Sequence, residues 1–447
     1  MNWNWIFRAV WMLCLGVNDM GREMKDSGIE WLGEIPEDWK ITKIKHKFKI
    51  VAGATPKSEQ KENFDGNIIW ITPADYKTTD KYVFAGKRNL SNIGYESCNT
   101  TIVPAGSIIF SKRAPIGSVA IARTELCTNQ GCLSCVKKED VDERYFYFLM
   151  SILTEEFELL GTGTTFKEIS AFSFANFRMP SPSISEQVTI ATFLEKKCGK
   201  IDNIIQNSRI SIGEYKKLKD AIISRAVTKG IRTNRIFCKS GIKWIQKLPE
   251  GWKEINPKAL FIQRKDKAYE GERQLTASQQ YGVILQEDYM KITGSKIVTV
   301  EKDFSILKHV EKGDFVISMR SFQGGLEYSK NTGSISSAYV MLVPNLEKVY
   351  PRFYRWLFKS SVYINALQST SNLVRDGQAM RYSNFAQVRL YEIPIEEQKE
   401  IADYLDEKCK AIDALIEKKE KFVNELKQYK ESMIYEYVTG KKEVPEI

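Results

Sequence analysis

The chain repeats its own sequence at long range, and this repeat limits the folds that it can adopt. SGIEWLGEIPEDWK begins at Ser27 and SGIKWIQKLPEGWK begins at Ser240, an offset of 240 − 27 = 213 residues. A second pair of similar segments surrounds Gly106 and Gly313, with an offset of 313 − 106 = 207 residues. Such a long period is not that of a solenoid repeat. It indicates a duplicated domain, for which two-fold pseudo-symmetry is the natural geometry.

The longest pair of matching segments has the sequence of helices. One segment starts at Ser185 and the other at Glu396, and Gln187 aligns with Gln398 at an offset of 398 − 187 = 211 residues. Ser183 or Ser185 can cap the first helix. Each half of the chain is therefore one globular block followed by one helical segment, and the blocks differ in sequence more than the helices do.

Apolar residues recur along both helical segments at steps that mostly sum to seven, which is the spacing of a coiled-coil seam. A single helix cannot bury such a stripe, but two equivalent helices in one chain can bury theirs against each other as an antiparallel pair. The alternative is that each helix packs only on its own block. The predicted seam residues are Ile201, Ile205, Ile212, Tyr215, Ile222, Ile412, Ile416, Val423, Leu426 and Met433.

The two blocks combine short strands with helices. IIWITPADY and TIVPAGSIIFSKR alternate strand-forming residues with turn residues, and residues 143–161 predict one amphipathic helix with a counterpart that begins at Pro351. We therefore predict an α+β fold with two pseudo-symmetric, mixed α/β domains separated by an antiparallel pair of long coiled-coil helices. The predicted boundaries are 1–24 for an N-terminal extension outside the core, 25–182 and 231–393 for the domains, and 183–230 and 394–442 for the helical regions.

The first residues, NWNWIFRAVWMLCLGV, are apolar but do not fit a targeting segment. Arg8 lies inside the apolar run rather than before it, unlike the charge of a signal peptide, and the run is shorter than a membrane-spanning helix requires. We interpret the residues before Met24 as an upstream extension, with a membrane anchor as the alternative.

The eight cysteines do not form a regular framework, which favours reduced thiols in a cytosol. Cys132 and Cys135 form one C-x-x-C, but the chain has two histidines in all, so a four-ligand zinc site is the weaker interpretation. We predict that both cysteines are small apolar residues of a strand.

Charge and missing motifs point to binding rather than catalysis. Lys and Arg outnumber Asp and Glu by 66 to 56, and a net charge of +10 suits a polyanionic partner such as nucleic acid, although plain enzymes are also often basic. The sequence has no phosphate-binding G-x-x-x-x-G-K-[ST] loop and no recognisable nucleophile motif.

Loops in both blocks mix small residues with Lys, Arg or Gln. Small residues allow the backbone to approach phosphates, and Arg and Gln side chains can form paired hydrogen bonds with guanine and adenine in the major groove. For any single residue, a solvated surface charge is the alternative. The candidate DNA-binding residues are Lys57, Lys112, Arg113, Thr164, Thr165, Lys167, Arg320, Gln323, Arg375, Gln378 and Arg381.

Three motifs together resemble a known family. The W-L-G-x-I-P-x-x-W opening, the Glu-Gln start of a proline-led helix, and the A-V-T-K-G or Y-V-T-G-K ending are similar to those of the DNA specificity subunit of Type I restriction-modification systems, over residues 26–442. The resemblance implies two target-recognition domains, each of which reads one half of a split site in double-stranded DNA. It implies helices that set the spacing of the half-sites and dock two methyltransferase subunits.

The resemblance also implies which parts of such a complex lie on other chains. S-adenosylmethionine would bind to the methyltransferase subunits, and ATP and magnesium to restriction subunits, so this chain is expected to bind no cofactor and to be non-catalytic. The location is expected to be cytoplasmic, without membrane contact. Two other classes stay open: a protein-binding scaffold with no DNA role, and a recognition protein with a fused or associated nuclease.

Overall fold

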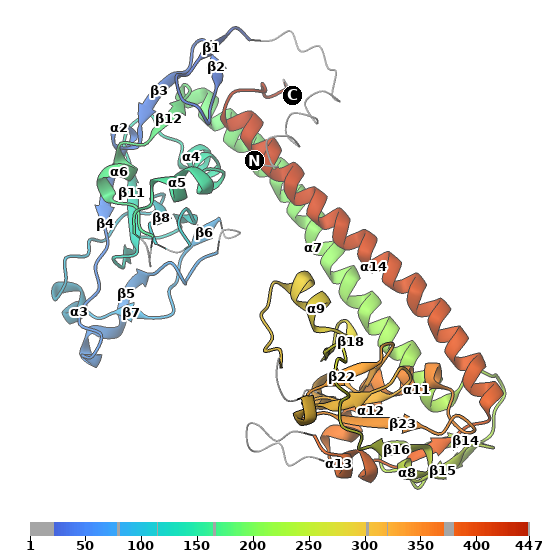
Figure 1. Cartoon of the computed structure of the whole chain (residues 1–447). Helices are drawn as coiled ribbons and strands as arrows, with labels where there is room; N and C mark the ends of the chain where they lie inside the picture. Colours follow the sequence, from blue (N-terminus) through green and yellow to red (C-terminus); the bar gives the residue numbers. More distant parts are fainter. Residues whose placement is uncertain are drawn as a thin grey trace. The chain divides into compact units, whose positions relative to one another are not determined.

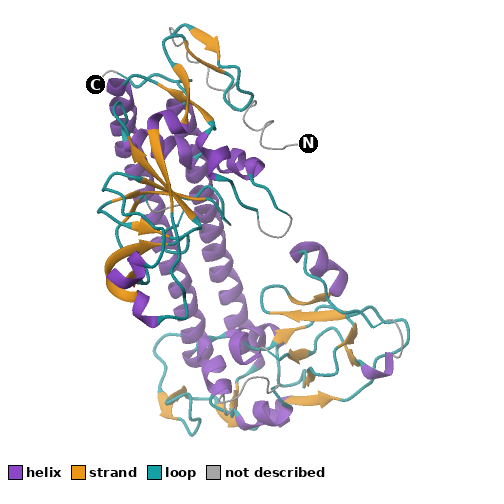
Figure 2. Ribbon diagram, turned by 90° about the vertical axis from the view of Figure 1, so that its left-hand side faces the viewer, coloured by secondary structure: helices purple, strands orange, loops and turns teal. Residues whose placement is uncertain are grey.

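The computed structural model describes residues 22–77, 81–113, 115–163, 167–300, 304–319, 321–370 and 380–445 (Figure 1). The chain divides into two compact units: unit 1 comprises residues 1–207 and 423–447, and unit 2 comprises residues 208–422. The two long helices, α7 (Ile184–Lys229) and α14 (Ile395–Val438), therefore each contribute one part to each unit. Figure 2 shows both helices as uninterrupted ribbons.

A five-stranded sheet forms the centre of unit 1. Its buried strands are apolar on both faces, as expected for a sheet covered on both sides. In sheet order the strands are β4 (Phe48–Ala52), β11 (Cys132–Lys137), β8 (Ile108–Ser111), β9 (Val119–Ala122) and β6 (Tyr82–Val83). A smaller sheet has the order β10 (Cys127–Thr128), β5 (Phe64–Ile71) and β7 (Asn89–Leu90).

Shorter elements complete unit 1. Two strand pairs, both antiparallel, are β1 (Met24–Asp26) with β2 (Glu34–Pro36), and β3 (Lys40–Lys43) with β12 (Arg178–Ser181). The helices are α2 (Ile44–Lys47), η1 (Lys61–Asn63), α3 (Asn92–Glu96), α4 (Glu143–Ser151), α5 (Thr154–Leu160) and α6 (Ala171–Ala175).

Unit 2 repeats the main sheet of unit 1. Its four strands in sheet order are β16 (Phe261–Arg264), β23 (Val340–Pro344), β20 (Phe315–Ile317) and β21 (Glu327–Tyr328). They begin 213, 208, 207 and 208 residues after β4, β11, β8 and β9 (261 − 48, 340 − 132, 315 − 108 and 327 − 119). The sheet order β4-β11-β8-β9 is therefore reproduced, so the sequence repeat is a repeat of the fold.

The rest of unit 2 differs more from unit 1. Its other strand pairs are β13 (Phe237–Lys239) with β14 (Lys247–Pro249), β15 (Lys253–Ile255) with β24 (Leu390–Glu392), β17 (Leu275–Ser278) with β18 (Gly282–Leu285), and β19 (Lys308–Val310) with β22 (Gly333–Ile335). Its helices are α8 (Pro257–Leu260), α9 (Gln286–Thr293), η2 (Phe304–Ile306), α10 (Ser321–Gly324), α11 (Pro351–Lys359), α12 (Ser361–Gln368) and α13 (Tyr382–Gln387).

The prediction of one helix over residues 143–161 is wrong, because the segment forms α4 and α5 with a break at residues 152–153. The counterpart breaks between α11 and α12 at Ser360, whose backbone is extended and whose side chain accepts a hydrogen bond from the Tyr363 amide. Since the apolar spacing continues across both breaks, periodicity alone does not reveal them. The cap supplied by Ser360 satisfies an amide that a continuous helix would have bonded internally.

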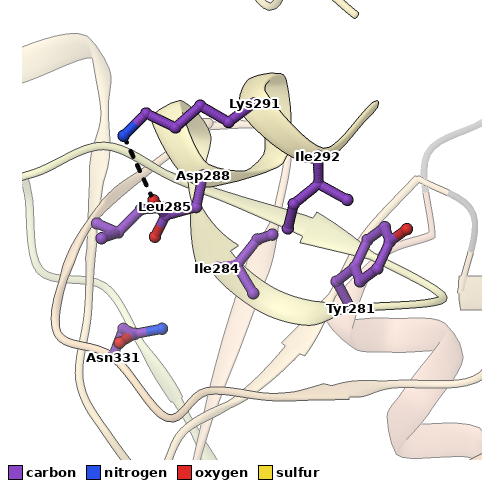
Figure 3. Close-up of a pocket in the computed structure, with 7 residues that line it drawn as sticks. All are labelled: Tyr281, Ile284, Leu285, Asp288, Lys291, Ile292 and Asn331. Carbon is purple, nitrogen blue, oxygen red and sulfur yellow. Dashed lines mark ion pairs between the residues drawn. The ribbon is translucent and has the colours of Figure 1, made fainter. Parts of the chain in front are cut away.

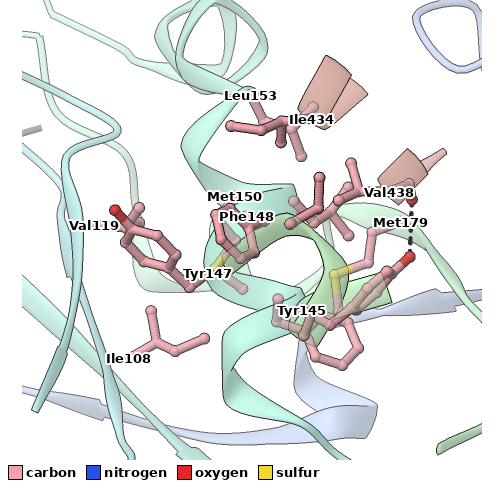
Figure 4. Close-up of a cluster of buried hydrophobic side chains, with 14 of the residues drawn as sticks. Ile108, Val119, Tyr145, Tyr147, Phe148, Met150, Leu153, Met179, Ile434 and Val438 are labelled. Carbon is pink, nitrogen blue, oxygen red and sulfur yellow. Dashed lines mark hydrogen bonds between the residues drawn. The ribbon is translucent and has the colours of Figure 1, made fainter. Parts of the chain in front are cut away.

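Helices α4 and α5 pack their apolar faces into the core of unit 1, together with the end of α14 (Figure 4). Tyr145, Phe146, Leu149 and Met150 are fully buried there. The Tyr145 hydroxyl donates a hydrogen bond to the Val438 carbonyl at 2.8 Å, which ties α4 to the last turn of α14.

The long helices are antiparallel within each unit. In unit 1, Ile201 and Ile205 of α7 share a buried cluster with Val423 and Met433 of α14, and Leu426 packs against it. Lys430 donates to Asp202 at 2.7 Å across the same seam. In unit 2 the buried cluster is Ile212, Ile412 and Ile416, with Tyr215 and Ile222 packed against it.

The seam has the symmetry of the repeat. Asp202 and Asp413 occupy the same repeat position, as do Lys219 and Lys430, each pair 211 residues apart. Unit 1 pairs Asp202 with Lys430, and unit 2 pairs Lys219 with Asp413, both at 2.7 Å. The predicted fold class, α+β with two repeated mixed domains and an antiparallel pair of long helices, is confirmed. The domain boundaries stay a prediction, although each helix is shared between the two compact units.

The structure describes the last residues of the predicted N-terminal extension. Arg22 and Glu23 belong to the fold of unit 1, since Arg22 pairs with Glu186 and the Glu23 carbonyl accepts from the Glu37 amide at 2.8 Å. Placing everything before Met24 outside the core was therefore wrong for these two residues; residues 1–21 lie outside the described part. No helix among the described residues is long and apolar enough to cross a bilayer.

Cys132 and Cys135 are buried residues of β11, as predicted. Burial raises the pKa of the Cys132 thiol to about 12 and that of Cys135 further. Among the described residues, no group of three or more His, Cys, Asp or Glu side chains is arranged to hold a metal ion.

Candidate nucleic-acid interface

The repeated Glu-Gln pair at each helix start attaches the helix to its domain. The Gln187 side chain is fully buried, accepts from the Asp142 amide at 2.9 Å and donates to the Pro182 carbonyl at 3.0 Å. Gln398 makes the equivalent bonds in unit 2, with the Tyr350 amide at 2.7 Å and the Ile393 carbonyl at 2.8 Å. A buried amide that satisfies backbone groups on two segments fixes their relative position.

The preceding glutamate binds the repeated tryptophan. In unit 1, Glu186 accepts a hydrogen bond from the Trp39 indole at 2.9 Å and pairs with Arg22. The other end of the frame comes from α14, since Gly440 has φ +73° and a Cβ there would lie 2.4 Å from the Pro36 ring. Only glycine fits this helix end. The three repeated motifs thus meet at one place in unit 1.

Unit 2 builds the same junction from the other copies. Arg235 binds both oxygens of Glu397 and lies 5.5 Å from the centre of the Trp252 ring. Gly230, at the end of α7, has φ +72°, and a Cβ there would approach Arg235 and Glu397. Each unit therefore combines one opening motif and one helix start with the helix end that belongs to the other copy.

The structure brings together two loops of unit 1 that contain candidate DNA-binding residues. Lys112 Nζ lies 2.8 Å from Glu168 Oε1, and Arg113 Nε donates to Glu168 Oε2 at 2.7 Å. Burial by itself raises the pKa of the Glu168 carboxyl, but the hydrogen bonds from Lys112 and Arg113 outweigh it, and the net pKa is lowered. These contacts therefore join residues 111–113 to residues 167–169.

The sequence prediction missed Glu168, although it lies in the stretch GTGTTFKEIS, residues 161–170, that supplied three of the candidates. An acidic residue is not expected to face DNA, and the candidates were therefore basic, amide or hydroxyl side chains. The available signal was the single carboxylate beside Lys167 in a loop otherwise made of small and neutral residues.

The other candidates of unit 1 do not join this cluster by any contact that the structure describes. Lys57 and Lys167 are both exposed, which suits phosphate contacts but is equally typical of solvated charges. Thr164 and Thr165 lie outside the described residues.

In unit 2, side chains of α11 and α12 fix the backbone of the segment that carries Gln323. Lys359 Nζ donates to the Gly324 carbonyl at 3.0 Å, and the Gln368 side chain donates to the Phe322 carbonyl at 2.7 Å. Gly325 has φ +77°, and a Cβ there would lie 2.0 Å from the Phe358 carbonyl oxygen. These contacts immobilise α10, and the side chain of Gln323 is exposed on it.

One other candidate of unit 2, Arg381, lies in the described part of the chain. Arg381 is exposed at the start of α13, where its amide donates to the Asn384 side chain at 3.0 Å. Arg320, Arg375 and Gln378 lie outside the described residues. The assignment of DNA contacts to all these side chains stays a prediction.

An open hollow of about 450 Å³ lies beside α9 in unit 2 (Figure 3). Its lining combines apolar side chains with Asn331, whose amide donates to the Val283 carbonyl at 3.0 Å. The lining residues are Tyr281, Ile284, Leu285, Asp288, Lys291, Ile292 and Asn331. Because none of them belongs to the loops described above, the hollow is separate from the candidate interface.

Apolar side chains also remain exposed on the long helices, away from the buried seam. Ile204 and Leu218 of α7 are 45% and 49% exposed, and Leu415 and Tyr429 of α14 are 44% and 49% exposed. The two pairs occupy the same repeat positions, since 415 − 204 and 429 − 218 both equal 211. Exposed apolar positions that recur in both copies are typical of a surface that contacts another protein.

Comparison with known proteins shows one consistent likeness. Residues 36–212 match the model of the Type I restriction modification DNA specificity domain. The chain is similar to Type I restriction-modification specificity subunits.

Specificity subunits from Methanocaldococcus jannaschii are among its relatives. The Type I restriction enzyme MjaIX specificity subunit is 36% identical over 42% of this chain and 42% of the relative, so the match spans less than half the length of either protein. The MjaVIII specificity subunit is 21% identical over 91% of this chain and 93% of the relative.

A solved chain from work on assembly and conformational transition of a type I R-M system has the same fold. It has a TM-score of 0.67 and 13% identity, and the match covers 90% of this chain and 98% of the solved chain. At this identity the likeness concerns the fold alone.

Proposed function

We propose that this chain is the DNA-recognition subunit of a Type I complex, in which unit 1 and unit 2 each read one half of a split site in double-stranded DNA. The observation that carries the proposal is the contrast between frame and loops. Both units repeat the same buried junction of Glu, Gln, Trp and Gly residues, while the loops that carry the candidate residues differ in charge and contacts. A constant frame with variable loops suits a protein that reads two different half-sites.

The helix pair would set the distance between the half-sites and would dock partner subunits. We propose that two methyltransferase subunits bind along the helices, one on each copy of the exposed apolar positions, and that restriction subunits can join the same complex. The recurrence of Ile204 and Leu218 at Leu415 and Tyr429 supports two equivalent docking surfaces.

The chain itself would be non-catalytic and would act in the cytoplasm. S-adenosylmethionine would be bound by the methyltransferase subunits, and ATP and magnesium by the restriction subunits. This division of tasks is consistent with a sequence that lacks phosphate-binding and nucleophile motifs.

Mapping of methylated adenines tests the proposal. The chain is expressed with its methyltransferase subunits, and modified positions are mapped across a genome that otherwise lacks them. We expect one split sequence, and replacing residues 25–182 by the first domain of a related subunit should change one half of it. Methylation of an unsplit or random set of sites would contradict the proposal, as would a change in both halves after the exchange.

Shortening the helices tests their spacing role. Removing one heptad from both α7 and α14 preserves the seam and shortens the pair by about 10 Å, or about three base pairs at 3.4 Å per pair. We expect the spacer of the methylated sequence to shrink accordingly. An unchanged spacer would refute this role of the helices.

A further inference from the structure

We propose that Arg113 reads a guanine in the half-site recognised by unit 1, and that Glu168 is the positioning residue that aims it. This inference rests on the proposed function and deepens it. It assigns one base and one residue to the recognition of that half-site.

The guanidinium of Arg113 is held through one of its edges. Its Nε donates to Glu168 Oε2 at 2.7 Å, and its side chain is 44% exposed. Within the part of the chain that the structure describes, no acceptor binds its Nη1 or Nη2 groups. The two terminal nitrogens, which carry four N–H donors, are therefore available in a fixed plane at the surface.

Glu168 is itself held in place. Its other oxygen lies 2.8 Å from Lys112 Nζ, and the Lys112 side chain is 15% exposed. The backbone fixes the same residues, because the Ile169 amide donates to the Lys112 carbonyl at 3.0 Å and the Thr162 and Glu168 backbones bond to each other at 3.0 Å in both directions. The carboxylate is thus anchored by its own strand-like bridge and by a second cation.

The charge balance of this cluster permits contact with DNA. One carboxylate and two cations leave a net charge of +1, so Glu168 does not present an uncompensated negative charge to the phosphates. Guanine offers O6 and N7 as two neighbouring acceptors in the major groove, which match the two terminal nitrogens of arginine, whereas adenine offers a donor in place of O6. Holding the Nε edge reduces the rotamer freedom that Arg113 loses on binding.

If Arg113 were only a solvated surface charge, we would expect fewer fixed contacts than its side chain has. Arg113 is paired with a carboxylate that is shared with a second cation and set by a backbone bridge. The Lys137–Glu143 pair, also 2.8 Å long and in unit 1, lies outside both loops and provides the matched control.

The experiment uses the full chain in complex with its methyltransferase subunits. Once the methylated sequence is mapped, Arg113→Lys, Glu168→Gln and the control Glu143→Gln are compared for methylation of every single-base variant of the site. We expect Arg113→Lys to lower the preference for guanine at one position of one half-site by about tenfold to a hundredfold, with the other half unchanged. Glu168→Gln should lower the preference at the same position by a smaller factor, and Glu143→Gln should leave it as in the parent protein.

A modified base provides a second test that needs no variant protein. Replacing that guanine by 7-deazaguanine removes N7, and it should weaken binding by the parent complex about tenfold. A purely structural role for Glu168 would instead weaken binding to all sequences equally.

The outcomes separate the inference from the proposed function. If the parent complex methylates a split site and Arg113→Lys keeps the same base preferences, or if the 7-deazaguanine duplex binds normally, the inference is overturned and the proposed function stands. If the parent complex recognises no split site, the proposed function fails first. A single relaxed guanine position in one half-site supports both.

Discussion

The two units place the same three residue types at the same repeat positions but connect them by different hydrogen bonds. The corresponding residues are Arg22, Trp39 and Glu186 in unit 1, and Arg235, Trp252 and Glu397 in unit 2. In unit 1 the glutamate is shared between the arginine and the indole. In unit 2 the arginine takes both carboxylate oxygens, and the buried Trp252 indole nitrogen has no hydrogen-bond partner among the described residues.

This difference separates what a repeated motif fixes from what it leaves to its surroundings. The motif determines which side chains meet, but burial determines how they pair. The side chain of Glu397 is 2% exposed, against 20% for Glu186, and that of Arg235 is 13% exposed, against 25% for Arg22. Two copies of one junction should therefore respond differently to the same substitution.

Removal of the glutamate should have the largest effect and should affect the units unequally. Glu397→Ala leaves the buried Arg235 guanidinium without a partner, at a cost of about 3–5 kcal/mol in the free energy of unfolding of unit 2. Glu186→Ala should cost about 1–2 kcal/mol, because Arg22 is more exposed and keeps Asp38 at 3.3 Å. Hydrogen exchange in urea, followed separately for peptides of each unit, measures both values. Equal losses would show that burial does not distinguish the two junctions.

The buried glutamines should respond alike. Gln187→Ala and Gln398→Ala each orphan a backbone amide, of Asp142 or Tyr350, and at least one backbone carbonyl. We expect each to lower the free energy of unfolding of its unit by about 2–4 kcal/mol, since each buried unpaired group costs about 1–3 kcal/mol. The same exchange experiment gives the two values. A difference larger than about 1 kcal/mol between the copies would contradict the equivalence of the two frames.

The loops of the two units should respond to pH in opposite directions. Burial raises the pKa of Glu327, next to Lys359 in unit 2, from 4.5 to about 6. The folded state therefore holds this proton more tightly, and the free energy of unfolding falls by up to about 2 kcal/mol as the pH rises from about 4.5 to 6, then levels off. Glu168 in unit 1 has a lowered pKa, so its stabilising effect is present at neutral pH and is lost as the pH falls through the folded-state pKa.

Urea denaturation between pH 2 and pH 8 tests this contrast when peptides from β20–β21 and from residues 161–170 are followed separately. Glu327→Gln should abolish the fall in the unit 2 peptides and leave the unit 1 peptides as they were. An unchanged pH profile in unit 2 would mean that Glu327 is ionised with its ordinary pKa in the folded chain.

The smallest effect concerns the two tryptophans. Trp39→Phe removes a hydrogen bond to a carboxylate, whereas Trp252→Phe removes an indole N–H that no described residue accepts. Both variants lose a similar ring area, so the difference between them comes from the hydrogen bond of the Trp39 indole. We expect Trp39→Phe to be the more destabilising of the two by about 1–2 kcal/mol. Thermal unfolding of the two variants gives the comparison. A larger loss for Trp252→Phe would indicate that its indole nitrogen is bonded in solution.

Sequence patterns predicted the parts of the molecule that local chemistry encodes. The seven-residue spacing identified the seam between the two long helices, and the offset of 207 to 213 residues identified two copies of one fold. These predictions succeed because helix periodicity and repetition are properties of consecutive residues. The same reasoning missed the break at Ser360, since the apolar spacing continues across it and only a local cap reveals it.

The sequence by itself determined that this protein has two matched domains, two long helices and basic, amide-rich loops. Only the tertiary structure decided which loop residues act together. Glu168 lies 55 residues after Arg113, and they meet because α4 and α5 return the chain to the end of β8. A contact of this kind depends on how sheet and helices pack rather than on any local pattern, so no spacing of residues along the chain encodes it.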